Sequence, residues 1–203
     1  MADYSDALIE WGSNTTTMLD FTKGLLGIET IDPSRDDEVS LFIQMAGEAC
    51  EMFIDNKIFE QNVTERFVTL QSPIALRYWP AGALVSVLRD TVDETTDWEI
   101  YIQDGIQWTV RYTGGSGSGY KQLDITYAAG YNPVPSDLAY AVAKTAIGYE
   151  RQGGGANSGS VSKETIVGVG SIEYNTNEDG LGSVGMLSPT TVGTLNMYRR
   201  WHV

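Results

Sequence analysis

The chain has 203 residues, of which 42% are hydrophobic, and it carries a formal net charge of −14 at pH 7. This size and composition indicate one domain, or a core domain with an insertion, that buries a hydrophobic core. The charge argues against tight nucleic-acid binding through a basic patch and against adhesion to acidic membranes. No apolar run reaches the roughly 20 residues that a membrane span requires, and the acidic N-terminal segment lacks the basic start of a signal peptide.

The single cysteine and the single histidine exclude several kinds of site. Cys50 excludes a disulfide within the chain and a cysteine metal cluster, and its place on the apolar stripe of a predicted helix favours a small buried side chain. His202 lies beside the last residue, where other segments cannot easily surround it to form a catalytic triad. We therefore expect no enzyme activity, no cofactor and no metal site.

The first part of the chain predicts an arm followed by a helix. Residues 1–16 are polar and acidic, with isolated apolar side chains, and predict a mobile arm or a short contact segment. Residues 17–57 predict the first part of a helical core. Thr16 or Thr17 can cap a helix that ends at Gly27, because glycine readily adopts the left-handed conformation that follows a helix.

The second helix is the most strongly patterned element of the sequence. Ser34 is the predicted N-cap, and a run of three carboxylates, Asp36 to Glu38, follows in the first turn, where the helix dipole favours negative charge. Apolar residues then recur at spacings of three and four over about five turns. They are Val39, Phe42, Ile43, Ala46, Ala49, Cys50 and Phe53.

Residues 58–128 change to a period of two and predict a β-rich insertion of about six short, mostly antiparallel strands. Asp104 and Gly105 predict a tight turn within it. Trp98 and Trp108 fall on alternating positions of a hairpin, which favours core positions over a sugar-stacking face that would also include Trp79. The acidic stretch 90–97 matches no calcium loop and predicts a solvated turn.

Residues 129–152 predict the third core helix. Ser136 is the expected N-cap, Asp137 stands in the first turn, and Gly153 ends the helix. Leu138, Val142, Thr145, Ala146 and Tyr149 form its apolar stripe.

Two segments complete the chain. Residues 153–187 are rich in glycine and predict a flexible hairpin or extension. Residues 188–203 predict a helix with Ser188 as N-cap and Pro189 at its first position. This helix carries the only basic and aromatic cluster of the acidic chain, Met197 to Trp201, and these residue types are enriched in protein interfaces. The predicted fold class is thus α+β: a helical core of three to four helices, an inserted antiparallel β subdomain, and an extension ending in a helix.

The order of these parts resembles one protein family. The sequence blocks that carry the resemblance cover roughly residues 19–201: GLLGIE, DPSRDDEVSLFIQMAGEACEMF, LRYWPAGALVSVLRD, LDITYAAGYNPVPSDLAYAVAKTAIGYER, SVSKETIVGVGSIEY and a terminal L-x-x-Y-R. Together they resemble the head–tail connector, or adaptor, proteins of tailed bacteriophages, in particular members with a β-rich insertion. The second helix departs from the family pattern because it lacks the usual glycine-arginine ending.

The resemblance implies a structural virion protein at the capsid's portal vertex, made in the host cytoplasm. Such proteins form a ring, usually of twelve copies, between the portal and tail proteins such as a nozzle, hub or tail-completion protein. DNA passes through the ring without specific binding. The resemblance implies portal docking by Leu195, Met197, Tyr198, Arg199, Arg200, Trp201 and His202. It implies ring contacts on the helices that carry Phe42, Ala46, Phe53, Leu138, Val142 and Tyr149.

One alternative from another class stays open at this point. A β-rich carbohydrate-binding or hydrolytic virion tail protein would need Trp79, Trp98 or Trp108 exposed in a groove with acidic neighbours.

Overall fold

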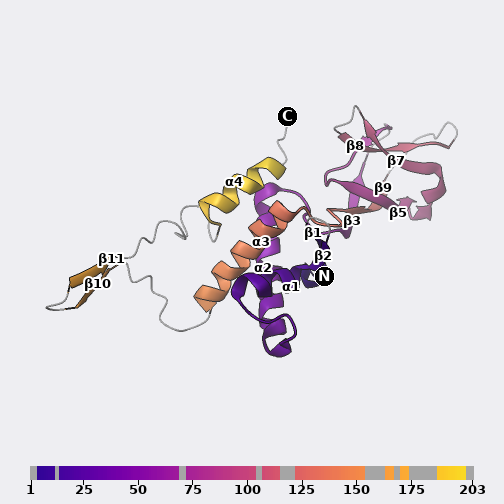
Figure 1. Ribbon diagram of the computed structural model, residues 1–203. Coiled ribbons are helices and arrows are strands. Elements are labelled where there is room, and N and C mark those ends of the chain that lie inside the picture. Colours follow the sequence, from indigo (N-terminus) through magenta and orange to yellow (C-terminus); the bar gives the residue numbers. More distant parts are fainter. Residues whose placement is uncertain are drawn as a thin grey trace. The chain divides into compact units, whose positions relative to one another are not determined.

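A computed structural model describes residues 4–11, 14–68, 72–103, 107–114, 122–153, 163–166, 170–173 and 187–199. The described chain combines four α-helices with antiparallel sheets (Figure 1), which confirms the predicted α+β class. It divides into two compact units. We call them the helical unit, built from Asp3–Ile54 and Pro135–Val203, and the β unit, built from Asp55–Val134.

The helical unit contains ten of the described elements. In chain order they are the 3₁₀ turn η1 (Tyr4–Asp6), β1 (Leu8–Trp11), β2 (Asn14–Thr17), α1 (Met18–Leu26), η2 (Pro33–Arg35), α2 (Asp36–Ile54), α3 (Ser136–Gly153), β10 (Lys163–Ile166), β11 (Gly170–Glu173) and α4 (Pro189–Tyr198). β1 pairs with β2, and β10 with β11, as antiparallel hairpins.

The described residues of the N-terminal segment pack on the helical unit, which agrees with a short contact segment, the second of the two predicted alternatives, and not with a mobile arm. Its isolated apolar residues are anchors: Tyr4 is buried and Ile9 is fully buried. The Tyr4 hydroxyl donates a hydrogen bond to Glu51 Oε2 on α2 at 3.2 Å. Isolated apolar residues gave no periodic signal in the sequence, because their partners come from a helix more than forty residues away.

The boundaries of α1 follow the sequence prediction. Thr17 Oγ1 accepts a hydrogen bond from the Asp20 amide at 3.1 Å, which satisfies one of the free amides of the first turn. Gly27 ends the helix with a φ of 73°, a conformation that glycine adopts without steric cost.

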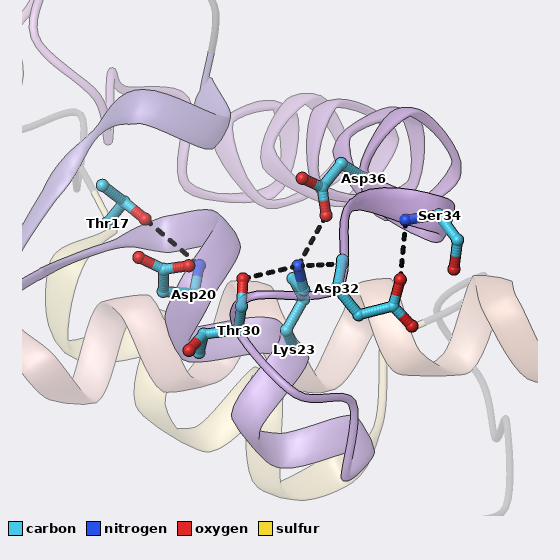
Figure 2. Close-up of polar contacts among 7 residues, drawn as sticks. All are labelled: Thr17, Asp20, Lys23, Thr30, Asp32, Ser34 and Asp36. Atoms are coloured by element: carbon cyan, nitrogen blue, oxygen red, sulfur yellow. Dashed lines mark hydrogen bonds and ion pairs between the residues drawn. The ribbon is translucent and has the colours of Figure 1, made fainter.

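A buried lysine closes the connection from α1 to α2 (Figure 2). The Lys23 side chain is 1% exposed, and its Nζ donates to Thr30 O at 3.0 Å, to Asp32 O at 2.6 Å and to Asp36 Oδ1 at 2.6 Å. Three acceptors satisfy the three donors of the ammonium group. The cation thereby ties the connecting loop to the first residue of α2.

The predicted capping role of Ser34 is wrong, because Asp32 takes it. Asp32 Oδ1 accepts a hydrogen bond from the Ser34 amide at 2.9 Å, and residues 33–35 form a 3₁₀ turn before α2 begins at Asp36. Hydrogen bonds from Ser34 lower the pKa of the Asp32 carboxyl. Proline at position 33 favours this arrangement, since it stands where a free amide would otherwise remain.

α2 and α3 pack against each other and form the core of the helical unit. Val39, Ile43 and Ile54 of α2 and Leu138 and Val142 of α3 are fully buried. The predicted burial of Cys50 is confirmed: its Sγ lies 3.9 Å from Thr145 Oγ1 on α3, and burial raises the pKa of its thiol to about 12.

The β unit contains two antiparallel sheets. One has the strand order β3-β9-β5-β6 and the other the order β4-β8-β7. The strands are β3 (Gln61–Phe67), β4 (Ile74–Ala75), β5 (Ala81–Arg89), β6 (Val92–Asp93), β7 (Trp98–Gln103), β8 (Gln107–Tyr112) and β9 (Leu123–Ala129), with the 3₁₀ turn η3 (Thr95–Asp97) before β7. β9 lies between β3 and β5, and its alternate residues Leu123, Ile125, Tyr127 and Ala129 are buried.

The β unit agrees with the prediction for its tryptophans and differs from it in the length of one strand. Trp98 is buried, and Trp108 packs against the same core, as the alternation predicted. The alternation of Ile74, Leu76 and Tyr78 with Ala75 and Arg77 also predicts a strand, but the strand is shorter and ends at Ala75. The predicted turn at 104–105 lies outside the described residues, but Gln103 and Gln107 on either side of it are paired.

The two ends of the β unit meet. The Tyr131 amide donates to Ile58 O at 2.9 Å, and Phe59 and Tyr131 form a parallel bridge. Gly130 lies at this crossing with a φ of 106°, and a Cβ there would be 2.5 Å from Phe59 O. Both the backbone conformation and the close approach therefore require glycine.

Candidate functional site: the terminal helix and the exposed helix faces

The terminal helix α4 begins as predicted. Ser188 Oγ accepts a hydrogen bond from the Thr191 amide at 3.1 Å, and Pro189 follows at the first helical position. One side of α4 is buried against α3 and α2, with Leu187, Thr191 and Leu195 nearly or fully buried. The helix is therefore packed on its own unit.

The residues predicted to dock on a partner are divided between the inside and the outside of the unit. Leu195 is fully buried. The Tyr198 hydroxyl lies within hydrogen-bond distance of both oxygens of Asp137, at 2.8 Å and 2.9 Å. The Arg199 guanidinium lies 5.4 Å from the centre of the Phe53 ring, within the range of a cation–π contact.

Met197 and Arg199 are the exposed members of this set among the described residues, and 70% of the Met197 surface is exposed. Arg200, Trp201 and His202 lie outside the described residues. The structure thus gives α4 an inner side, which its own unit uses, and an outer side on which Met197 stands.

The residues predicted for ring contacts lie mostly inside the helical unit. Ala46, Leu138 and Val142 are fully buried, where they hold α2 and α3 together. Phe42, Phe53 and Tyr149 are half-buried, and burial raises the pKa of the Tyr149 hydroxyl. A contact between copies through these helices therefore depends on other side chains of α2 and α3.

The outward side of α2 carries apolar residues that the sequence analysis did not single out. Leu41, Met45 and Met52 are 57%, 40% and 79% exposed. At 3.6 residues per turn they fall within about 40° of one another, opposite the buried face of the helix. These three residues recur at helical spacing in the sequence, but the buried face of α2 has more apolar residues and dominated the pattern.

The acidic stretch 90–97 uses its carboxylates to shape a turn, in agreement with the prediction. Asp93 Oδ1 accepts hydrogen bonds from the Thr95 amide at 2.9 Å and from its hydroxyl at 2.6 Å. These bonds, the hydroxyl bond first, lower the pKa of Asp93. Glu94 pairs with Arg89, so two of the carboxylates already have partners within the turn.

A search for other chemistry gives two negative findings for the described residues. No group of three or more His, Cys, Asp or Glu side chains in the described ranges is arranged to hold a metal ion. None of the helices in the described part of the chain combines the length and the apolar character that crossing a membrane requires.

Comparison with known proteins gives matches in structure alone. No protein family and no curated protein matches the sequence. A chain from the neck of an empty GTA particle matches with a TM-score of 0.59 at 13% identity, covering 91% of this chain and 90% of that chain. A chain from the virion of a native gene transfer agent (GTA) particle matches with a TM-score of 0.57 at 14% identity, over 92% and 90%.

A chain from the neck of a native GTA particle, computed with C12 symmetry, matches with a TM-score of 0.56 at 12% identity, over 92% of this chain and 91% of that chain. These identities are low, so the matches establish a shared fold. The fold is shared over about nine-tenths of the chains compared, which includes both the helical unit and the β unit.

Proposed function

We propose that the chain is a structural virion protein of a phage-like particle and serves as a head–tail adaptor in its neck. In this role, copies of the chain form a ring between the portal and the tail proteins and line the channel through which DNA leaves. The observation that carries the proposal is the fold shared with chains of GTA necks over about nine-tenths of the length. Those necks were computed with C6 and with C12 symmetry, and both are compatible with the proposed ring of twelve copies.

The charge of the chain supports the same role. A net charge of −14 per copy repels phosphate groups. A ring of such chains gives a wall past which a duplex moves without adhering. The proposed partners are therefore the portal, a tail protein and further copies of the chain, with no specific DNA contact and no membrane. The proposed location is the portal vertex of the virion, after synthesis in the host cytoplasm.

The terminal segment 188–203 is the proposed portal contact. The inner side of α4 is occupied by its own unit through Leu195 and Tyr198. The contact therefore falls to the outer side, represented by Met197, and to Arg200, Trp201 and His202, which follow it in sequence. Methionine, arginine and tryptophan are residue types that interfaces concentrate.

Location is tested on particles purified from the source of this gene. Gold-labelled antibody against the chain should mark one vertex of each particle, and cryo-EM should show this fold in a ring beneath the portal. Labelling of the tail fibres, of the whole capsid, or of no particle component would overturn the proposal.

Portal docking is tested with Met197→Asp, matched by Ile31→Asp. Both substitutions place a carboxylate on an exposed apolar site of the helical unit, since Ile31 is 85% exposed. Met197→Asp should weaken capture by immobilised portal protein at least tenfold, while Ile31→Asp should leave capture unchanged. Equal capture of both variants contradicts the docking role of α4. Point variants are preferable to deletion of 191–203, because a deletion also removes Leu195 from the core.

A further inference from the structure

We propose that the copies of this chain contact one another through two different helix faces, with the outer face of α2 on one copy packed antiparallel against the outer face of α3 on the next. The inference rests on the proposed function, since it names the surfaces that join copies in the ring. It is carried by the exposed side chains of α2 and α3 and by the fit between them.

The α2 face combines apolar and acidic side chains. Leu41, Met45 and Met52 form its exposed apolar stripe, and Glu48 stands between the two methionines, also exposed. Surface methionines on one helix stripe are unusual in a chain with only six methionines. Their flexible side chains suit a surface that packs on a partner. We call Leu41, Met45, Glu48 and Met52 the α2 stripe.

The α3 face combines an aromatic residue, cations and a glycine. Tyr140 is 39% exposed, and the Nζ of the exposed Lys144 lies 5.7 Å from the centre of its ring. Arg151 is exposed about two turns after Lys144. Gly148 lies between Lys144 and Arg151 in the sequence. We call Tyr140, Lys144, Gly148 and Arg151 the α3 stripe.

Gly148 is informative because the isolated chain gives it no packing role. A Cβ built at this position meets nothing within 4 Å. Glycine inside a helix costs about 1 kcal/mol relative to alanine. Among the described residues, no close contact offsets this cost at Gly148. A shallow gap on a helix surface instead permits the close approach of a second helix.

The two stripes match when the helices run in opposite directions. Each stripe spans about three turns. Antiparallel alignment sets Glu48 opposite Lys144 and Met52 opposite Tyr140. The same alignment places the Met45 side chain over the gap at Gly148. A parallel alignment would instead place Met45 opposite Lys144 and Glu48 over the gap, which loses both the charge match and the packing match.

The position of the stripes favours a ring. α2 and α3 contact each other through their buried faces, so their exposed stripes face opposite sides of the helical unit. A contact between two different surfaces of identical chains is heterologous and forms a ring when its rotation closes. Copies that each carry a charge of −14 repel one another, so a local match of acidic and basic residues matters for their association.

Thiol cross-linking tests the pairing. Particles are made with the double variant Met52→Cys and Tyr140→Cys in place of the wild-type chain and treated with a short bis-maleimide. The antiparallel alignment sets these two positions opposite each other, whereas the parallel alignment keeps them about three helical turns apart. The expected product is a ladder of multimers, because each copy then carries both halves of the contact. The single variants should cross-link only when mixed, and should give dimers. The native thiol, Cys50, is buried and gives no background.

The control is Thr64→Cys combined with Tyr140→Cys, since Thr64 is exposed on β3 of the other unit. Dimers from Met52→Cys alone would show that the α2 stripe pairs with itself and would overturn the inference. Particles that contain the double variant without cross-links would also overturn it while leaving the adaptor role intact. Absence of the wild-type chain from the neck would instead overturn the proposed function.

A second variant separates assembly from folding. Gly148→Leu adds a side chain whose Cβ meets no described atom within 4 Å, and leucine favours a helix more than glycine does. The Tm of the free protein should therefore stay constant or rise, while incorporation into particles falls at least tenfold. Gly24→Leu on α1 is the matched control, because a Cβ there also meets nothing within 4 Å. Incorporation of Gly148→Leu at the wild-type level contradicts the proposed contact.

Discussion

The helical unit and the β unit both pair arginines with carboxylates, and the helical unit differs in burying a lysine. The four arginines of Asp55–Val134 each form an ion pair with a carboxylate of the same unit. The pairs are Arg66 with Asp124, Arg77 with Asp55, Arg89 with Glu94, and Arg111 with Glu99. The helical unit likewise pairs Arg35 with Glu38 and Glu150. Each unit has a lysine beside a tyrosine ring, Lys144 at Tyr140 and Lys57 at Tyr78, but Lys23 of the helical unit is buried among three oxygen acceptors.

The exposed apolar residues of the β unit and of α2 are distributed differently. In the β unit, Val68, Val85, Val92 and Ile102 are exposed singly on different segments, which is normal for a protein surface. On α2 the exposed apolar residues share one face. The comparison shows that α2 gathers exposed apolar side chains on one face, whereas the exposed apolar side chains of the β unit are scattered.

The largest effect is expected from Lys23→Met, which removes the buried cation. Two backbone carbonyls and the Asp36 carboxylate then lose their donor. Because the Asp36 side chain is 34% exposed and can regain water, we expect a loss of about 2–3 kcal/mol in unfolding free energy, at or below the lower end for a broken buried pair. Urea denaturation measures it. Asp36→Asn, which keeps an acceptor, should cost less; an equal cost would contradict the structural role assigned to the three-acceptor site.

A smaller effect is expected from Arg66→Gln at the surface of the β unit. The hydrogen bond from Arg66 is the first cause of the lowered pKa of Asp124, so the variant should move that pKa up toward its ordinary value. A lowered carboxyl pKa stabilises the fold above the ordinary Asp pKa and ceases to do so as the pH falls through the lowered value. NMR titration of the Asp124 carboxyl checks the shift, and acid unfolding of the variant should begin at a slightly higher pH. An unmoved Asp124 pKa would show that the ion pair is absent in solution.

The smallest effect on the fold is expected from Lys144→Gln. Its side chain is exposed and contacts an aromatic ring, so the unfolding free energy should change by less than about 0.5 kcal/mol. Calorimetry of the free protein provides the measurement. A loss comparable to that of Lys23→Met would show that Lys144 serves its own unit, and the contrast between the two lysines would disappear.

Local chemistry made much of the fold predictable from the sequence. Thr17, Gly27, Ser188 and Pro189 act within a few residues of themselves, so the limits of α1 and the start of α4 follow from capping rules. The alternation in β9 predicted which of its residues are buried. The position of Cys50 on an apolar stripe predicted its inert, buried thiol.

Features that depend on distant partners were not predictable in this way. The burial of Ile9 and the bond from Tyr4 to Glu51 join segments far apart in the chain. The 3₁₀ turn at residues 33–35, with Asp32 as its cap, was not predicted, so the capping role was assigned to Ser34. For the candidate site, the apolar spacing of α2 and α3 identified residues that share a face. Burial then showed that Ala46, Leu138 and Val142 face inward, and that exposed side chains on the opposite face are available to a partner.

The meeting of the two ends of the β unit, at Ile58 and Tyr131, bears on how this chain can change over evolutionary time. An inserted segment whose ends lie a hydrogen bond apart requires only a short bridge from its host. Such an inserted segment can be lengthened, exchanged or lost while the packing of α2 against α3 stays the same. In the proposed adaptor role, diversity of tail partners can accumulate in this inserted segment, while the proposed contact between copies constrains the helical frame separately.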